Sequence, residues 1–148
     1  MNSIKKCYLD ANVLIYFKDV SSPYHQESVA LIEKLVAEKF GIFISPLCLD
    51  EYLHAVALYL KNLKSKNFEV ELKDYLKSIL LIPNLNLVNP SKNKDLQTKV
   101  VDFMVSFFLR PRDAYHLFIM KENKIKFIAT FDNDFKQVFQ KGLVKHFS

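Results

Sequence analysis

The chain has 148 residues, half of them hydrophobic and a quarter charged, which is the composition of an ordinary globular domain. At this length we expect one domain spanning residues 1–148. Two glycines are too few for a glycine-rich phosphate-binding loop. Lysine and arginine outnumber aspartate and glutamate by 21 to 16, and this excess favours polyanionic partners without identifying one.

The two cysteines and the apolar segments bear on the cellular location of the protein. Cys7 and Cys48 lie in apolar surroundings and lack the spacing of a disulfide framework or a metal site, so we expect buried thiols in a reducing cytoplasm. Asp10 interrupts the first apolar run before it reaches the length of a signal peptide. Later runs fall far short of the roughly 18 residues of a membrane span. We therefore expect a cytoplasmic protein with no membrane segment.

The first half of the chain is predicted to alternate short strands with longer helices. Apolar residues recur at helical spacing after Ser21-Ser22-Pro23, and Ser45-Pro46 combines a capping hydroxyl with a proline at a helix start. The stretch from Lys61 to Asn67 is rich in lysine and is expected to be a solvated turn. In chain order, we expect a strand at residues 4–9, helices at 12–17 and from 21 until Gly41, a strand at 42–44 and a helix from 46 to 60.

The second half continues the same alternation. Pro83 and Asn84 interrupt a helix, and Pro111 separates two others. In chain order, we expect a helix at residues 69–81, a strand at 85–88, helices from 91 to 109 and from 113, a strand at 126–130, a short helix at 133–139 and an edge strand at 143–147. Short apolar strands between longer helices indicate an α/β fold with a mostly parallel sheet.

Four acidic residues are placed where they could meet. Asp10 follows the first strand directly, Asp132 lies two residues beyond Thr130 at the end of the fourth, and Glu51 lies less than two turns into the helix after the second. Because the carboxyl ends of parallel strands share one edge of a sheet, these acids should gather there. Asp113 joins them only if the helix that it opens has its N-terminus at that edge.

Each acid also has a structural interpretation. Asp10 and Asp113 can cap helices, which contributes about 1 kcal/mol, and Asp132 and Asp134 can form turns. Glu51 interrupts an otherwise apolar helix face, so we expect it to bind a metal or to pair with a lysine or arginine.

Four segments of the chain resemble the PIN-domain ribonucleases, most closely the VapC-type toxins of bacterial and archaeal toxin–antitoxin pairs. The segments are IKKCYLDANVLIY, ISPLCLDEYL, RDAYHLFIMKEN and IATFDNDF, in the family's order across residues 4–135. The resemblance implies a three-layer α/β/α sandwich with a central, mostly parallel sheet of about four or five strands. It also implies metal-dependent hydrolysis of RNA, a protein antitoxin and a homodimer, for which the apolar helices between residues 22 and 82 could supply the interface.

Carried over residue by residue, the resemblance places the family's catalytic and metal-binding acids at Asp10, Glu51, Asp113 and Asp132. The supporting positions fall on Asn12, Thr130 and, as an accessory acid, Asp134. The sequence departs from the family in two places: Asp50 offers a second acid beside Glu51, and the lysine-rich segment from Lys61 to Lys77 matches no family motif.

Four oxygen ligands without a histidine or cysteine cluster suit Mg²⁺ or Mn²⁺ better than zinc. Without metal the carboxylates repel one another, which should raise some of their pKa values or loosen the site. One or two ions would relieve this repulsion and activate a water for attack on a phosphodiester. We expect Asp10 and Asp132 to bind metal directly, and Glu51 and Asp113 to act as ligands, water-positioning groups or a general base.

Residues around Asp113 are candidates for substrate contact. Arg110 and Arg112 precede it and could bind RNA phosphates, or they could be solvated surface. His116 lies one turn after it and could face substrate, but a packed or surface histidine is the more ordinary interpretation. Four aromatic residues at helical spacing are expected in the core or at an interface: Tyr16, Phe17, Tyr52 and Tyr59.

Two other functions were weighed against a nuclease. The segment DANVL after a strand resembles the motif of haloacid-dehalogenase-type phosphatases, but Asn12 stands where their second aspartate is needed. A PIN-like module that binds RNA without cutting it is the other alternative, and the presence of all four acids argues against it.

Overall fold

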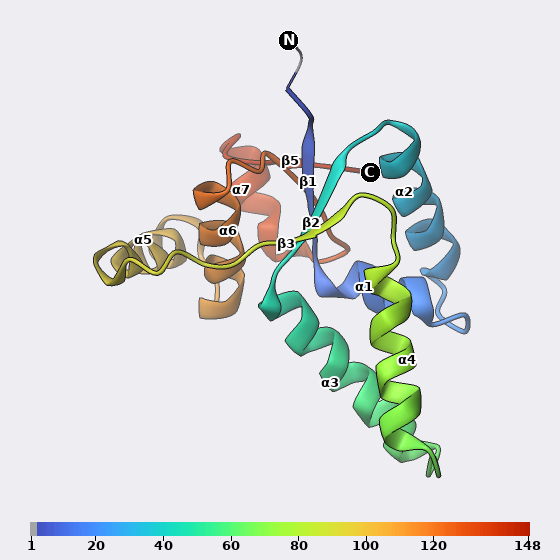
Figure 1. Ribbon diagram of the computed structural model, residues 1–148. Helices are drawn as coiled ribbons and strands as arrows, with labels where there is room; N and C mark the ends of the chain where they lie inside the picture. The colour runs from blue at the N-terminus through green and yellow to red at the C-terminus, as the bar shows by residue number, and fades with distance from the viewer. Residues whose placement is uncertain (1–2) are drawn as a thin grey trace.

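A parallel sheet of five strands forms the centre of the molecule, as the computed structural model of residues 3–148 shows (Figure 1). The strands are β1 (Lys6–Leu9), β2 (Gly41–Ile44), β3 (Leu85–Leu87), β4 (Phe127–Ala129) and β5 (Lys145–His146). Their spatial order is β3-β2-β1-β4-β5, and every neighbouring pair runs parallel. The predicted α/β fold is therefore confirmed, including the edge position of the last strand.

Helices cover both faces of the sheet and complete three layers (Figure 1). On one side lie α1 (Ala11–Lys18), α2 (His25–Ala37), α3 (Pro46–Asn62) and α4 (Phe68–Leu80). On the other side lie α5 (Thr98–Phe107), α6 (Pro111–Glu122) and α7 (Lys136–Gln140). Two short 3-10 helices, η1 (Lys94–Gln97) and η2 (Asn133–Phe135), precede α5 and α7.

The chain changes faces between the neighbouring strands β1 and β4. After β1 it continues into α1 on one side of the sheet, and after β4 it continues into η2 and α7 on the other. In an open parallel sheet this divergence leaves a crevice beyond the carboxyl ends of the two strands. Asp10 follows β1 directly and Thr130 and Asp132 follow β4, so three polar side chains are placed at the crevice.

The central strand is apolar on both faces because helices cover it from both sides. Cys7, Tyr8 and Leu9 of β1 are completely buried between β2 and β4. Both cysteines of the chain are buried free thiols, as expected; Cys48 lies at the start of α3. This rigid central strand holds the residue that follows it, Asp10, in a fixed position.

One helix begins later than the prediction because short polar side chains form turns before it. The helix expected from residue 21 begins at His25. Asp19 accepts hydrogen bonds from the amide and the hydroxyl of Ser21, and the hydroxyl of Ser22 accepts one from the amide of Tyr24. These local bonds compete with the first helical turn.

The helix expected at residues 91–109 is wrong in its first part. Residues 88–93 are irregular, and η1 separates them from α5. Ser91 Oγ accepts a hydrogen bond from the amide of Asn93, whose side chain accepts one from the amide of Asp95. Side-chain turns of this kind satisfy backbone donors without a helix.

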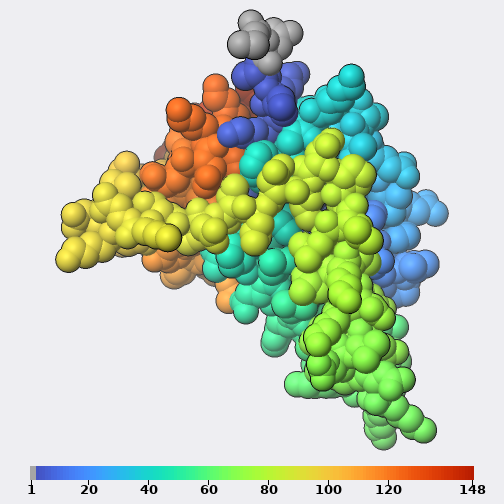
Figure 2. All heavy atoms as spheres, viewed as in Figure 1, coloured from blue at the N-terminus to red at the C-terminus, as the bar shows by residue number. Residues whose placement is uncertain are grey.

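Two parts of the molecule extend beyond the layered body. The pair α3 and α4 forms one long projection, and α5 forms the other, shown in yellow in Figure 2. The tip of the first projection is the lysine-rich turn at residues 61–67, which is largely exposed as expected. No helix within residues 3–148 has the length and hydrophobicity needed to cross a membrane.

Candidate active site

All four acids singled out in the sequence line one cleft at the carboxyl edge of the sheet. The cleft has a volume of about 640 Å³ and is lined by Asp10, Asn12, Ile15, Glu51, Arg110, Pro111, Arg112, Asp113 and Asp132. Proline at the first position of α6 starts that helix at the cleft, so Asp113 in its first turn points inward. Asp113 was expected to join the other acids only if its helix has its N-terminus at this edge of the sheet, and α6 does.

Asp10 is both a helix cap and a wall of the cleft. Its Oδ1 accepts a hydrogen bond of 2.7 Å from the amide of Ala11, and it caps α1 as predicted. Its Oδ2 accepts one of 2.7 Å from the hydroxyl of Thr130. Burial raises the pKa of the Asp10 carboxyl, and the bond from Thr130 opposes that rise. A cation bound beside this buried carboxyl would stabilise its ionised form.

Asn12 and Thr130 tie the ends of β1 and β4 together. The Asn12 amide nitrogen lies 3.4 Å from Thr130 Oγ1, and its oxygen accepts a hydrogen bond from the amide of Phe131. Thr130 Oγ1 also accepts a hydrogen bond of 3.0 Å from the amide of Asp132. Both residues therefore fix the backbone that carries the acids.

Asp113, Asp132 and Asp134 form one acidic group, with a carboxylate oxygen from each lying within 4.8 Å of the others. Asp132 also forms a turn, as the structural interpretation predicted, because it accepts a hydrogen bond from the amide of Asp134 and caps η2. Burial raises the pKa of Asp113 to about 6, and the charges of Asp134 and Asp132 add to this. The expected repulsion among the acids is thus present at Asp113, in addition to the effect of burial.

Asp10, Glu51 and His116 form a second group of ligand atoms within 4.8 Å of one another. Glu51 Oε1 lies 3.3 Å from His116 Nε2 and 3.6 Å from Arg112 Nε. The hydrogen bond to His116 lowers the pKa of Glu51, and Arg112 adds to that effect against burial. The rise in pKa expected for some of the acids occurs at Asp10 and Asp113, whereas Glu51 has positive partners and a lowered pKa. The predicted pairing with an arginine is present in the same cleft.

Sequence reasoning missed a buried polar cluster behind Glu51. His116 is 2% exposed, which confirms the packed interpretation, and its Nδ1 lies 2.6 Å from the hydroxyl of Tyr8. Cys48 Sγ lies 3.2 Å from the same hydroxyl. Burial lowers the pKa of His116, but its contacts with Cys48 and Glu51 outweigh burial and raise that pKa to about 10. The expectation that no histidine or cysteine lies near the acids is wrong.

A signal for this cluster is present in the sequence. Tyr8 lies on β1, two residues before Asp10, whose backbone is still extended, and His116 lies three residues after Asp113 on α6. These spacings place each polar residue on the same side of the chain as an acid.

The two arginines contact acids of the cleft. Arg110 Nη2 lies 2.8 Å from Asp134, and its Nε lies 3.8 Å from Asp113. Arg112 Nη2 lies 3.6 Å from Asp50, the second acid beside Glu51. Both arginines are exposed, so these pairs contribute little to stability and the side chains can reach other anions.

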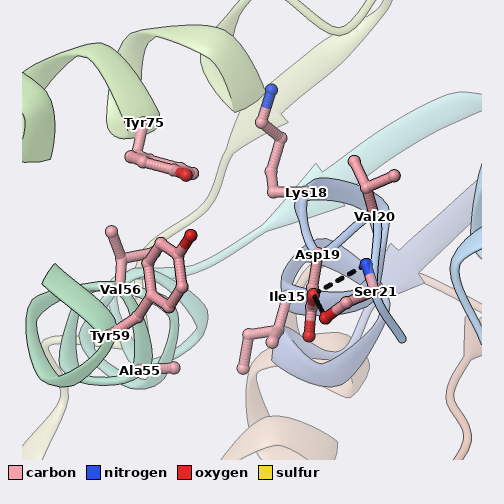
Figure 3. Close-up of a pocket in the computed structure, with 9 residues that line it drawn as sticks. All are labelled: Ile15, Lys18, Asp19, Val20, Ser21, Ala55, Val56, Tyr59 and Tyr75. Carbon is pink, nitrogen blue, oxygen red and sulfur yellow. Dashed lines mark hydrogen bonds between the residues drawn. The ribbon is translucent and has the colours of Figure 1, made fainter. Parts of the chain in front are cut away.

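A second hollow lies beside the cleft, on the other side of Ile15, which lines both. Figure 3 shows it between the end of α1 and the helices α3 and α4, with the rings of Tyr59 and Tyr75 on one side and Val20 on the other. Its volume is about 350 Å³. Tyr59 is half exposed here, so it does not belong to the core.

The other aromatic residues from the sequence pattern pack in the structure. Tyr52 is fully buried and its hydroxyl donates to the carbonyl of Tyr75, while Phe17 packs against the core. Tyr16 contacts the rings of Tyr24 and Phe131. The core interpretation is confirmed for Tyr52 and Phe17.

The donor set of the cleft fits a hard divalent cation. Carboxylate oxygens dominate it, and Asp113 Oδ2 is buried without any hydrogen-bond partner among residues 3–148. An anionic oxygen withdrawn from water needs a positive partner, and Arg110 reaches it only at 3.8 Å. Oxygen ligands of this kind are those that Mg²⁺ and Mn²⁺ bind.

Comparison with known proteins identifies the family. The family model of the PIN domain matches residues 7–140, nearly the whole chain. The chain belongs to the PIN-domain family. A comparison of this PIN domain with curated proteins found no match.

Solved structures share the fold of this PIN domain. FitAcB from Neisseria gonorrhoeae has a TM-score of 0.67 at 19% identity, covering 96% of both chains. VapBC2 from Rickettsia felis, bound to a DNA fragment from its promoter, has a TM-score of 0.64 at 17% identity, covering 95% of this chain and 96% of that one. VapC20 from Mycobacterium tuberculosis, a toxin that cleaves the sarcin-ricin loop, has a TM-score of 0.61 at 15% identity, covering 89% of this chain and 94% of that one.

Proposed function

We propose that this PIN domain is a metal-dependent endoribonuclease that hydrolyses RNA phosphodiester bonds and acts as the toxin of a type II toxin–antitoxin pair. One observation carries the proposal: four acids from separate parts of the chain line a single cleft, where the buried Oδ2 of Asp113 has no hydrogen-bond partner. The cofactor we propose is Mg²⁺ or Mn²⁺. The resemblance of the fold to VapC20, a toxin that cuts RNA, supports the reaction class.

The four acids are proposed to have different roles in binding a cation and positioning a water. Asp10 and Asp132, each fixed by hydrogen bonds at a strand end, are proposed as direct ligands. Glu51, ionised beside His116, and Asp113, whose pKa is about 6, are proposed to complete the ligand set or to accept a proton from the attacking water. A bound divalent ion would supply the positive charge that polarises the phosphate and lowers the pKa of that water.

Arg110 and Arg112 are proposed to hold the substrate phosphates. Both line the cleft and are exposed. A guanidinium group can donate two parallel hydrogen bonds to two oxygens of one phosphate. In the structure they neutralise Asp134 and Glu51, so an RNA phosphate would compete with these acids for them.

The partner we propose is a small antitoxin protein, because the solved structures that share this fold include a toxin-antitoxin complex from Klebsiella pneumoniae, and VapBC2 and FitAB are each bound to a DNA fragment. The hollow in Figure 3 suits an apolar side chain of such a partner, since Ile15, Val20 and Val56 line it next to the cleft. A homodimer is also proposed, and exposed Val101 and Val105 on α5, with Phe108 directly after it, offer apolar surface for it, outside the helices first expected to provide the interface.

The phosphatase alternative finds no support in the family or the site. Asn12 lies where that mechanism needs an acid, and its amide is engaged with Thr130 and Phe131. A module that binds RNA without cutting it would need none of the four acids in the cleft.

The test of the proposal is RNA cleavage by the purified chain and by Asp132→Asn. We expect the variant to lose at least a hundredfold in rate with an unchanged circular dichroism spectrum, because it removes a charge from the cleft and keeps the shape. Asp74→Asn, on exposed α4, is the matched control and should cleave like the unchanged chain. Equal rates for all three proteins would refute the site.

A further inference from the structure

A buried chain of hydrogen bonds leads from the central strand to the back of Glu51. The hydroxyl of Tyr8 lies 2.6 Å from Nδ1 of His116, and Nε2 of that ring lies 3.3 Å from Oε1 of Glu51. The rings of Tyr8 and His116 also meet edge to face, with centroids 5.5 Å apart. The histidine is thus held through both nitrogens and through contact between the two rings.

The tyrosine end of this chain is anchored in two further places. The hydroxyl of Tyr8 lies 2.6 Å from Ser45 Oγ, at the N-cap of α3, and 3.2 Å from Cys48 Sγ in the first turn of that helix. One hydroxyl therefore joins β1, α3 and α6, the elements that precede or carry Asp10, Glu51 and Asp113. Movement of any one element would disturb this contact.

His116 presents an N–H group to Glu51 whichever way the hydroxyl hydrogens point. A hydroxyl can donate or accept a hydrogen bond, whereas a carboxylate can only accept. Nδ1 faces the hydroxyl of Tyr8 and Nε2 faces the carboxylate, so a hydrogen on Nε2 satisfies both contacts. The reverse neutral tautomer would leave a buried lone pair opposite a carboxylate oxygen, which is costly, and in the charged ring, which the raised pKa of His116 favours, Nε2 also carries a hydrogen.

The histidine reaches the cleft only through Glu51. The ring is 2% exposed, and the cleft lining among residues 3–148 does not include it. A glutamate side chain is flexible, and ordering such a side chain costs up to about 2 kcal/mol. A donor that is itself fixed by Tyr8 lowers this cost before a cation arrives.

We propose that His116 and Tyr8 are positioning residues, which hold the Glu51 carboxylate in the orientation that a divalent cation requires. This inference rests on the proposed metal site, and it adds the two residues that preorganise one of its ligands.

The test is Mn²⁺ binding by calorimetry to the metal-free chain and to three variants. His116→Leu removes the donor, Tyr8→Phe removes only the hydroxyl that fixes it, and His116→Gln returns an amide donor near Nε2. We expect the leucine variant to bind Mn²⁺ about tenfold more weakly, the phenylalanine variant to be intermediate and the glutamine variant to stay within about threefold of the unchanged chain. In RNA cleavage, kcat should fall in the same order while KM stays unchanged.

His54→Leu is the matched control, because His54 is exposed on α3 one turn from Glu51 and should bind Mn²⁺ normally. If His116→Leu and Tyr8→Phe fold and bind Mn²⁺ with unchanged affinity, the positioning role is wrong, even if both melt earlier. Should the leucine variant not fold, Tyr8→Phe decides by the same criterion. Absence of Mn²⁺ binding by the unchanged chain would instead overturn the proposed metal site itself.

Discussion

Asp113 is an acid of the cleft whose negative charge is disfavoured by its surroundings. Burial and the charges of Asp134 and Asp132 raise its pKa to about 6, above the value near 4 of an unfolded aspartate. Keeping it ionised therefore destabilises the metal-free fold. The penalty is complete above pH 6 and disappears as pH falls toward 4, because the carboxyl is then protonated in the folded and, finally, in the unfolded chain.

Replacing Asp113 by asparagine should remove this penalty. Without metal at pH 8, we expect Asp113→Asn to raise the free energy of unfolding by roughly 1 kcal/mol, allowing for partial solvent screening. At pH 4 the gain should vanish. Thermal melts at both pH values check this, with Asp102→Asn on exposed α5 as the control. A gain that is the same at both pH values, or no gain at all, would contradict the electrostatic account.

The sequence was sufficient to predict that the acids lie in one cleft, but not that Tyr8 and His116 are in contact beneath it. Asp10 and Asp132 could be placed because each follows an apolar strand, and parallel strands end at one edge. The spacing of Tyr8 and His116 places each on the side of its element that carries an acid, but their contact at 2.6 Å could not be predicted because it depends on how two elements pack. The same holds for the low pKa of Glu51, which comes from His116.

At the scale of elements, the hydroxyl of Thr130 joins the carboxyl ends of β1 and β4. It donates to Asp10 at 2.7 Å and accepts from the amides of Asn12 and Asp132 at 3.4 and 3.0 Å. Thr130→Val keeps the shape of the side chain and leaves these groups without a partner, so the two strand ends should lose their connection.

We expect Thr130→Val to lower the free energy of unfolding by roughly 2 kcal/mol, and Thr130→Ser, which keeps the hydroxyl, by less than about 1 kcal/mol. Urea unfolding followed by circular dichroism measures both. Equal stability of the valine variant and the unchanged chain would show that the hydroxyl does not join the strands.

Element positions followed from the sequence wherever apolar spacing decided them. The helix expected at residues 69–81 is Phe68–Leu80 in the structure, because its apolar stripe packs on α3. The expected helix at 91–109 failed at its start, where Ser91 and Asn93 make turns with the backbone. Local hydrogen bonds of this kind leave no periodic signal in the sequence.

For the whole molecule, the alternation of strands and helices predicted the layers, but not which surfaces meet partners. The hollow beside the cleft arises where the end of α1 faces both helices of the projecting pair (Figure 3). No sequence pattern predicts this hollow, because the residues that line it come from separate segments of the chain.

Filling this hollow should separate partner binding from catalysis. Ala55→Arg places a long charged side chain in the hollow, and we expect at least tenfold weaker binding of the proposed antitoxin, with RNA cleavage preserved. Ala30→Arg, at an exposed position on α2, is the control. Unchanged binding by Ala55→Arg, measured by calorimetry, would place the partner elsewhere.

The most direct test of the account is the metal dependence of RNA cleavage by the purified chain. We predict that a chelator abolishes cleavage of a single-stranded RNA, that added Mg²⁺ or Mn²⁺ restores it, and that Asp10→Asn remains inactive with either ion. Cleavage that persists in the chelator, or that Asp10→Asn performs at the normal rate, would contradict a metal-dependent ribonuclease at this cleft.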